Sequence, residues 1–214
     1  ICCNKPYQTN NDNNILSKLN NIEDKFNNNI GICLLGFRTV GVQGDGRSYN
    51  HCVGLTCNEN NISKINWNNM YKLAKDIPRM IHDINRVIFI FGDKISGQQK
   101  DVTTTYLNEK TAHLLRECDN IVNEILYKDK LVKKLSQVPV IMFPNNFGKS
   151  GQRSICIRTF ITNDFMTGVP AIVGTEYMPY NVLNEMVSKI QKVNGISRVA
   201  FDLTSKPPGT TEWE

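Results

Sequence analysis

The feature that most constrains the fold of this 214-residue chain is an order of helical and strand-like segments that occurs twice. In each half a helical stripe of apolar residues precedes two strand-like runs, a second stripe and a closing apolar strand. Members of a stripe lie three or four residues apart, as one face of a helix requires. The stripes are Ile15, Leu16, Leu19, Ile22 and Phe26, then Met70, Leu73, Ile77 and Ile81, in the first half, and Leu114, Leu115, Cys118, Ile121 and Ile125, then Val182, Met186, Ile190 and Val193, in the second.

Arginines mark matching places in the two halves. Arg38 and Arg153 each open a strand-like run and lie 115 residues apart, and Arg86 and Arg198 open the closing strands and lie 112 residues apart. Two features kept at nearly one spacing favour an internal repeat over chance. We therefore predict an α+β fold of two tandem α-β-β-α-β repeats, with helices packed on one face of mostly antiparallel sheets.

The junction between the repeats is predicted near residues 93–101, where glycines and polar residues cluster. This gives a first domain at residues 1–95 and a second at residues 96–214. Such halves have open sheet edges, and pairing between subunits is one way to cover them. A homodimer is therefore expected.

Composition narrows the functional classes. The net charge of +5 suits an anionic small molecule. The basic residues are scattered and lack the stacking-aromatic pattern of a nucleic-acid-binding module, so no nucleic-acid partner is expected. No run reaches the roughly 18 apolar residues of a membrane helix, so no membrane partner is expected either.

Cysteine and histidine usage indicates the compartment. Seven cysteines occur without a CxxC pair, and those in apolar patterns predict buried thiols in a reducing, cytoplasmic compartment; they are Cys33, Cys52, Cys118 and Cys156. The three histidines show no metal-ligand spacing, so no metal site is predicted.

A candidate binding element lies between Val42 and Cys57, which reads as a β-hairpin. The Asp45-Gly46 pair is a strong turn signal. Asp45 and Arg47 would project from the tight tip, where an acid and a forked cation recognise complementary parts of one polar ligand. A plain structural hairpin is the alternative.

The last nine residues, from Lys206 to Glu214, place a cation before two prolines and an acid beside a tryptophan. Lys206 follows Arg198 by eight residues, an even spacing that puts both side chains on one face of an uninterrupted strand. There they would flank a dianion such as a phosphate monoester. Gln137 precedes an apolar strand, and its amide can donate and accept hydrogen bonds. Solvated side chains and a disordered tail are the alternatives.

A loop is predicted over residues 164–170. Phe165 and Met166 are expected to fill the core there rather than to touch a ligand.

Five segments together closely resemble the C-terminal dimerisation domain of glutamine-hydrolysing GMP synthases. The resemblance covers nearly the whole chain and is closest to the longer, animal-type version with a duplicated subdomain. The segments are Gly44-Asp45-Gly46-Arg47-Ser48-Tyr49, Asp164-Phe165-Met166-Thr167, Met178-Pro179-Tyr180, Gly195-Ile196-Ser197-Arg198-Val199 and Lys206-Pro207-Pro208-Gly209-Thr210-Thr211-Glu212-Trp213-Glu214.

The resemblance implies a part in making GMP from XMP. It assigns XMP binding and dimerisation to this region, and the ATP- and Mg²⁺-dependent pyrophosphatase and the glutaminase to upstream domains. The chain would then carry no cofactor and no catalytic residue and would be inactive alone. A fragment also fits a chain that begins with Ile1.

The resemblance also implies roles for single residues. Lys206, Arg198 and Gln137 match residues that hold the XMP phosphate. The remaining matches are Asp45 and Arg47 in the hairpin and Thr211 and Glu212 in a tail that closes over the nucleotide. The alternative is a purely structural dimerisation module with no direct substrate contact.

Overall fold

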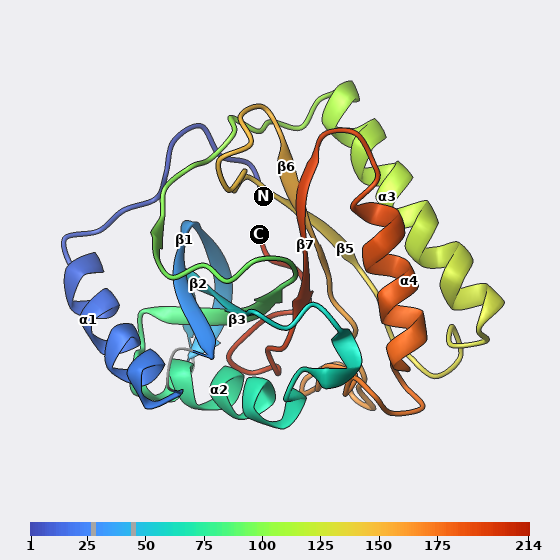
Figure 1. The fold of residues 1–214 in the computed structure, drawn as a ribbon, viewed down its shortest axis with the longest axis horizontal. Coiled ribbons are helices and arrows are strands. Elements are labelled where there is room, and N and C mark those ends of the chain that lie inside the picture. The colour runs from blue at the N-terminus through green and yellow to red at the C-terminus, as the bar shows by residue number, and fades with distance from the viewer. Residues whose placement is uncertain (27–28, 44–45) are drawn as a thin grey trace.

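The structure, a computed structural model, describes residues 1–26, 29–43 and 46–214, so Asp45 at the predicted hairpin tip lies outside the described residues. In the described part a single sheet has the strand order β4-β1-β2-β3-β7-β6-β5 (Figure 1). The strands are β1 Ile30–Gln43, β2 Gly46–Cys57, β3 Ile84–Ile90, β4 Gly97–Gln99, β5 Val140–Phe143, β6 Arg153–Ile157 and β7 Ile196–Asp202. The α-helices are α1 Asp12–Glu23, α2 Trp67–Met80, α3 Glu109–Lys128 and α4 Tyr180–Ile190, and 3-10 turns lie at Asp24–Phe26 and Ile62–Lys64.

Each half contains the order α-β-β-α-β, but the two strand-like runs divided at Arg38 form one strand, β1, and a further strand, β4, precedes α3. β1 is antiparallel to β2 and β2 is parallel to β3, while β5 is antiparallel to β6 and β6 is parallel to β7. The halves join where β3 and β7 pair antiparallel, and β4 adds parallel to β1. The mostly antiparallel character agrees with the prediction, although the sheet also has parallel pairs, and the two halves share one continuous sheet where sheets in the plural were expected. The duplication itself, and the division at residues 95 and 96, stay predictions.

Arg38 does not open a strand. It lies inside β1, where the register with β2 shifts between Leu34 and Arg38. Arg153 does open β6, so these two arginines occupy different places in their halves. Arg86 and Arg198 do correspond, because each is the third residue of its strand, β3 or β7.

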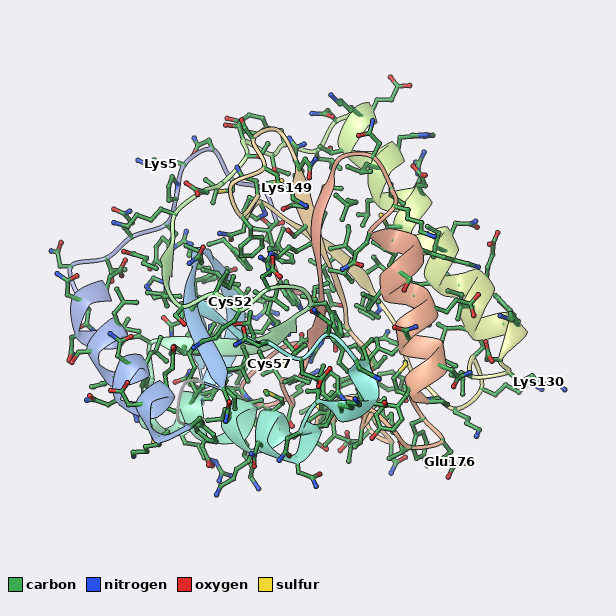
Figure 2. All side chains as sticks on the ribbon, viewed as in Figure 1. Lys5, Cys52, Cys57, Lys130, Lys149 and Glu176 are labelled. Carbon is green, nitrogen blue, oxygen red and sulfur yellow. The ribbon has the colours of Figure 1, made fainter. Side chains whose placement is uncertain are left out.

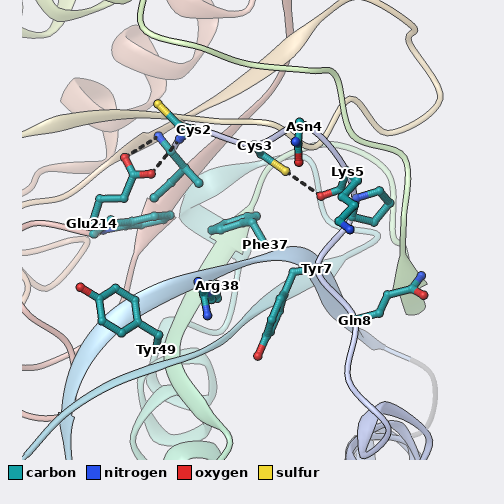
Figure 3. Close-up of a pocket in the computed structure, with 13 residues that line it drawn as sticks. Cys2, Cys3, Asn4, Lys5, Tyr7, Gln8, Phe37, Arg38, Tyr49 and Glu214 are labelled. Carbon is teal, nitrogen blue, oxygen red and sulfur yellow. Dashed lines mark hydrogen bonds and ion pairs between the residues drawn. The ribbon is translucent and has the colours of Figure 1, made fainter.

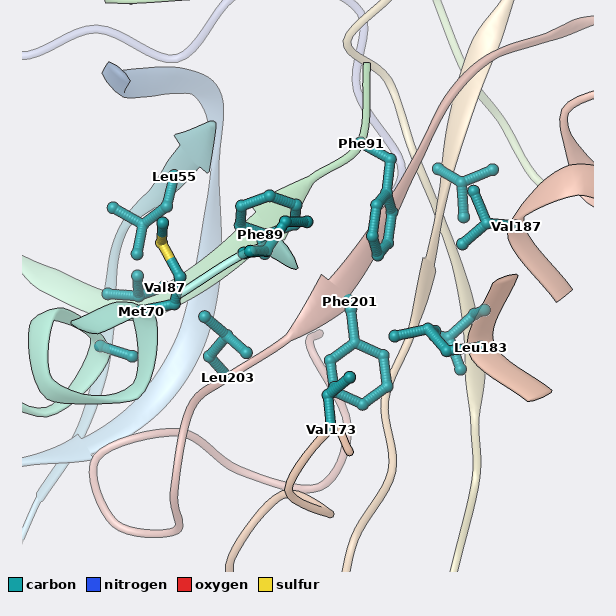
Figure 4. Packing of buried hydrophobic residues seen from close by; sticks show 14 of the residues in the cluster. Leu55, Met70, Val87, Phe89, Phe91, Val173, Leu183, Val187, Phe201 and Leu203 are labelled. Carbon is teal, nitrogen blue, oxygen red and sulfur yellow. The ribbon is translucent and has the colours of Figure 1, made fainter. Parts of the chain in front are cut away.

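The two faces of the sheet are covered in different ways. The apolar residues of all four helices pack into one large cluster on one face, part of which is drawn in Figure 4. Successive side chains of a strand point to opposite faces, so alternate residues of β1 divide between this cluster and a smaller one. The smaller cluster contains Trp213, close to the carboxyl end. The second face is thus closed in part by the tail.

The cysteines predicted to be buried lie inside the protein, and labelled charged side chains project from its surface. Cys33, Cys52, Cys118 and Cys156 are free and buried, as predicted, and Cys57 is buried as well. In Figure 2 Cys52 and Cys57 lie within the fold, while the labelled side chains of Lys130 and Glu176 project outward. Within the described ranges, the helices are all too short or too polar to cross a bilayer.

Candidate functional site

The carboxy-terminal tail, residues 203–214, runs along the edge of β1. β4 pairs with only part of β1, so the later part of that strand has room for another neighbour. The tail takes this place, because the amide of Val40 donates to the carbonyl of Trp213 at 2.9 Å and the amide of Val42 donates to that of Pro208 at 2.8 Å. The tail is therefore a sheet-edge element in this structure, contrary to the disordered alternative.

A buried cluster of charges lies where β7 passes into the tail. One carboxylate oxygen of Asp202 accepts hydrogen bonds from Arg86 at 2.6 Å, Arg158 at 2.7 Å and the indole of Trp213 at 3.1 Å. All three charged side chains are fully buried. Burial by itself would raise the pKa of Asp202, but the guanidiniums of Arg158 and Arg86 outweigh it and hold that pKa below its usual range. The cluster thus keeps one negative and two positive charges inside the protein.

Arg86 connects this cluster to the backbone of the tail. Its Nη2 donates to the carbonyl oxygens of Thr210 at 3.0 Å and Glu212 at 3.2 Å, and its guanidinium lies 4.8 Å from the ring centre of Trp213. Thr211 is consequently buried. The side chain of Glu212 is exposed, and its carboxylate forms none of the hydrogen bonds found among the described residues. The backbone of the tail is therefore fixed, while the carboxylate of Glu212 remains available to bind a ligand.

Gln137 and Lys206 lie at one end of the structure, at the two sides of a short backbone ladder. The ladder pairs Gln137 with Phe160, Ile161 with Val169, and Gly168 with Lys206. Neighbouring strands are about 4.8 Å apart, so three such steps place the two backbones about 14 Å from each other. Both residues carry long polar side chains, and the segments of residues 160–161 and 168–169 lie between their backbones.

The loop beside Lys206 is ordered by its own hydrogen bonds. The Asp164 carboxylate accepts from the amides of Met166 and Thr167, both at 2.9 Å, and these bonds, with that of Thr167 foremost, lower the pKa of Asp164. The Lys206 ammonium donates to the carbonyl of Phe165 at 2.6 Å. Phe165 and Met166 are 58% and 75% exposed, so the prediction that they fill the core is wrong.

Arg47 is exposed at the start of β2 and pairs across the hairpin with Val42. Because Val42 also bonds to Pro208, two strand spacings, about 10 Å, separate the backbones of Arg47 and Pro208. The fold therefore brings the hairpin to the tail across more than 150 residues of sequence. Gly44 and Asp45 of the hairpin tip are outside the described residues.

Arg198 lies apart from these groups. Its Nη1 donates to the carbonyl of Asp93 at 2.7 Å, and its guanidinium lies 5.3 Å from the ring centre of Phe147. Desolvation lowers its pKa, with Asp93 opposing the shift. β7 ends at Asp202, four residues before Lys206, so the uninterrupted strand expected to align the two cations does not exist. They lie at opposite ends of β7.

A separate hollow of about 640 Å³ opens between residues 1–8, β1, β2 and the end of the tail (Figure 3). Arg38 lies in it, with its guanidinium carbon 5.4 Å from the ring centres of both Tyr7 and Tyr49. Those two rings hold the cation by their faces. Among the described residues predicted to bind nucleotide, none lines this hollow, so it is distinct from the region of Lys206 and Gln137.

The residues that fix the tail were not predicted from the sequence. Arg86 and Arg158 each interrupt or directly follow an apolar strand, and Asp202 closes another. Charged residues in such runs are rarely buried unless they are paired. The available signal was the occurrence of these arginines and of the oppositely charged Asp202 in apolar runs that predict buried strands.

Comparison with known proteins agrees with the motifs. A model of the GMP synthase C terminal domain matches residues 124–213. The chain is 51% identical over 191 residues to a GMP synthase (glutamine-hydrolyzing) of Dictyostelium discoideum, and 40% identical over 198 residues to a probable GMP synthase of Caenorhabditis elegans. These alignments cover 84% and 85% of this chain and 26% of each relative. A probable GMP synthase of Leptospira interrogans is 34% identical over 182 residues, or 85% of this chain and 28% of the relative.

Proposed function

With residues 124–213 belonging to the GMP synthase C-terminal domain family, we propose that the chain is the XMP-binding and dimerising part of a GMP synthase. The whole enzyme, a ligase, would convert XMP to GMP with ATP and ammonia from glutamine. The chain spans about a quarter of the length of the relatives it matches. In this proposal the ATP- and Mg²⁺-dependent pyrophosphatase and the glutaminase lie upstream, and the chain alone is inactive and contributes no nucleophile.

The observation that carries the proposal is that the hairpin, the segment around residues 160–169 and the tail meet at one end of the sheet. The hairpin brings Arg47, the tail brings Lys206, and Gln137 lies beside the third segment through its pairing with Phe160. These side chains are able to hold a phosphate monoester, which carries close to two negative charges at neutral pH. Lys206 has three N–H donors and spends one on the carbonyl of Phe165. Gln137 and Arg47 are exposed and supply an amide and a bidentate guanidinium.

Glu212 suits a different part of the nucleotide. A carboxylate only accepts hydrogen bonds when ionised, so it would repel the phosphate and pair with a ribose hydroxyl or a ring N–H. Arg86 fixes the carbonyls on both sides of Thr211, which sets where Glu212 projects. Recognition of the sugar or base then depends on a backbone position that is already in place.

Arg198 stays outside the proposed phosphate contact. Its guanidinium is occupied by the carbonyl of Asp93 and the ring of Phe147. The distance along β7 from Arg198 to Asp202 alone is about 13 Å, at about 3.3 Å per residue. A single phosphate would not bridge Arg198 and Lys206.

The docked tail favours a preformed wall over a flap that shuts after the nucleotide arrives. Backbone bonds to β1 and the Arg86 contacts hold residues 208–213. Only the exposed side chains, such as that of Glu212, are free to adjust. A wall ordered in advance costs less conformational entropy when the ligand binds.

Titration calorimetry of XMP with the full-length enzyme tests the proposal. Lys206→Ala should weaken binding by about 1–3 kcal/mol, the loss of one charge-assisted contact. Lys192→Ala removes an exposed lysine just after α4, outside the candidate site, and serves as the control. XMP affinity that is unchanged by Lys206→Ala would refute the phosphate role.

A second candidate function, a purely structural dimerisation module, is favoured by an exposed apolar surface. Six large apolar residues of one segment are between 38% and 75% exposed: Phe165, Met166, Val169, Ile172, Tyr177 and Tyr180. Exposed large apolar residues are one sign of an interaction surface. Met166→Asp should dissociate the dimer in sedimentation experiments without unfolding the chain. If Lys206→Ala leaves XMP binding intact while Met166→Asp abolishes dimerisation, the purely structural dimerisation module replaces XMP binding as the proposed function.

A further inference from the structure

A second hollow, of about 480 Å³, lies between α2, the stem of the β1–β2 hairpin and the tail. In Figure 1 α2 runs beside the β1–β2 hairpin. Ten residues line the hollow, among them Lys75, Pro78, Arg79, His82, Pro207 and Pro208. We propose that it is a second binding site, which takes the phosphate group of a small phosphate ester.

The charge of the hollow points to an anion. Lys75, Arg79 and His82 line it, and none of the ten lining residues is acidic. Lys75 and Arg79 are four residues apart, so they project from one face of α2. Both are exposed, and neither forms any hydrogen bond or ion pair found among the described residues. Two cations on one face that have no carboxylate partner among the described residues can donate hydrogen bonds to a ligand.

The rest of the lining is suited to the body of a phosphate ester. Pro78 projects from α2, and Pro207 and Pro208 face the hollow from the tail, so apolar rings stand on two sides of it. The volume lies in the range of small-molecule sites, in which apolar walls carry a few placed polar groups. An ester with a planar or apolar group would bury that group against the prolines while its phosphate meets the basic side.

The hollow is distinct from the site proposed for XMP. Ser205 and Pro207 line it, but the residue between them, Lys206, does not. The ammonium of Lys206 instead bonds to the carbonyl of Phe165. The tail therefore separates two cationic regions, and anion binding at α2 does not depend on the role given to Lys206.

Titration of the ¹⁵N-labelled 214-residue chain, followed residue by residue by NMR, tests the proposal. The probes are inorganic phosphate and AMP. Both should shift signals of α2 and of Ser205, with AMP at least about tenfold tighter because its base covers apolar surface. Lys75→Gln and Arg79→Gln should each weaken phosphate binding about fivefold, the effect expected of an exposed charge pair. These exposed substitutions should not affect folding.

Two variants make the result specific. Lys72→Gln removes an exposed charge of α2 that does not line the hollow, and it should leave binding unchanged. Lys206→Ala should also leave phosphate binding at α2 unchanged, whatever it does to XMP. Equal losses in Lys72→Gln and Arg79→Gln would overturn the proposal, because phosphate would then respond to the general positive charge of α2 and not to the hollow. Shifts confined to the surroundings of Lys206 would overturn it as well.

Discussion

Asp202→Asn provides a direct test of how the tail is held. The substitution keeps the shape of the side chain and removes its negative charge. Asp202 is fully buried and pairs with two buried guanidiniums, at 2.6 Å from Arg86 and 2.7 Å from Arg158. The cluster carries a net charge of +1 in the native protein and would carry +2 in the variant. Nothing else within hydrogen-bond reach of these arginines is negatively charged among the described residues.

The expected loss of stability follows from this burial. Breaking a buried ion pair by removing one partner costs about 3–5 kcal/mol, because the remaining charge is desolvated without compensation. For a domain of this size each kcal/mol lowers the melting temperature by about 2–4 °C, so a drop of about 6–20 °C is expected. Thermal and urea unfolding followed by circular dichroism measure it.

Arg158→Met is the matched control. It leaves the neutral pair of Arg86 and Asp202, and it removes two buried guanidinium nitrogens, Nε and Nη2 of Arg158, that have no hydrogen-bond partner. Removing unpaired buried donors recovers part of their desolvation cost. We expect Arg158→Met to change stability by at most about 1 kcal/mol. If it costs more than Asp202→Asn, or if Asp202→Asn costs less than about 1 kcal/mol, the electrostatic account of the cluster is wrong.

The pH dependence of stability gives an independent check. Because the arginines hold the pKa of Asp202 below its usual range, the unfolded chain binds a proton at a higher pH than the folded one. The stabilisation from Asp202 is therefore fully present above the unfolded pKa of about 3.9 and is lost as the pH falls through the folded pKa. Asp202→Asn should remove this contribution to acid unfolding.

Three further predictions concern other parts of the molecule. Trp213→Ala should cost about 3–5 kcal/mol and make the tail susceptible to carboxypeptidase, because Trp213 is 2% exposed. Desolvation lowers the pKa of buried His51, against the opposing charge of Asp12, so stability should fall as the pH drops below about 6.5, and thermal melts of His51→Gln should show a flatter dependence. At pH 8 a thiol reagent should modify exposed Cys2 quickly and buried Cys52, whose pKa burial raises well above its usual value, only after unfolding.

The order of elements could be predicted from sequence because apolar periodicity reflects burial directly. The stripe from Ile15 to Phe26 became α1, and the stripe from Val182 to Val193 became α4. The division of β1 at Arg38 was wrong for a related reason. Both faces of β1 are covered, so its sequence is a nearly continuous apolar run without the alternation that would have shown the strand continuing through Arg38 to Gln43.

The arrangement of the candidate site was less predictable than its members. Alternation along a strand predicts a shared face only while the strand lasts, and β7 ends at Asp202, where the chain turns into the tail. Lys206 and Arg198 therefore lie apart, because the strand ends between them and their spacing in the sequence does not reveal this end. Phe165 and Met166 were misjudged because apolar character alone does not tell a core residue from one on an interaction surface.

The buried charges are better explained by placement of the tail than by stability. Apolar residues of similar volume in place of such a cluster are often neutral or stabilising, and two nitrogens of Arg158 already lie buried without partners. An apolar core would still join β3 to β7, but it would offer no donor to the carbonyls of Thr210 and Glu212. Arg86 supplies these bonds from inside the sheet. A tail that must hold one acid at a fixed position near the chain end needs such directional contacts, because apolar packing fixes burial without fixing orientation.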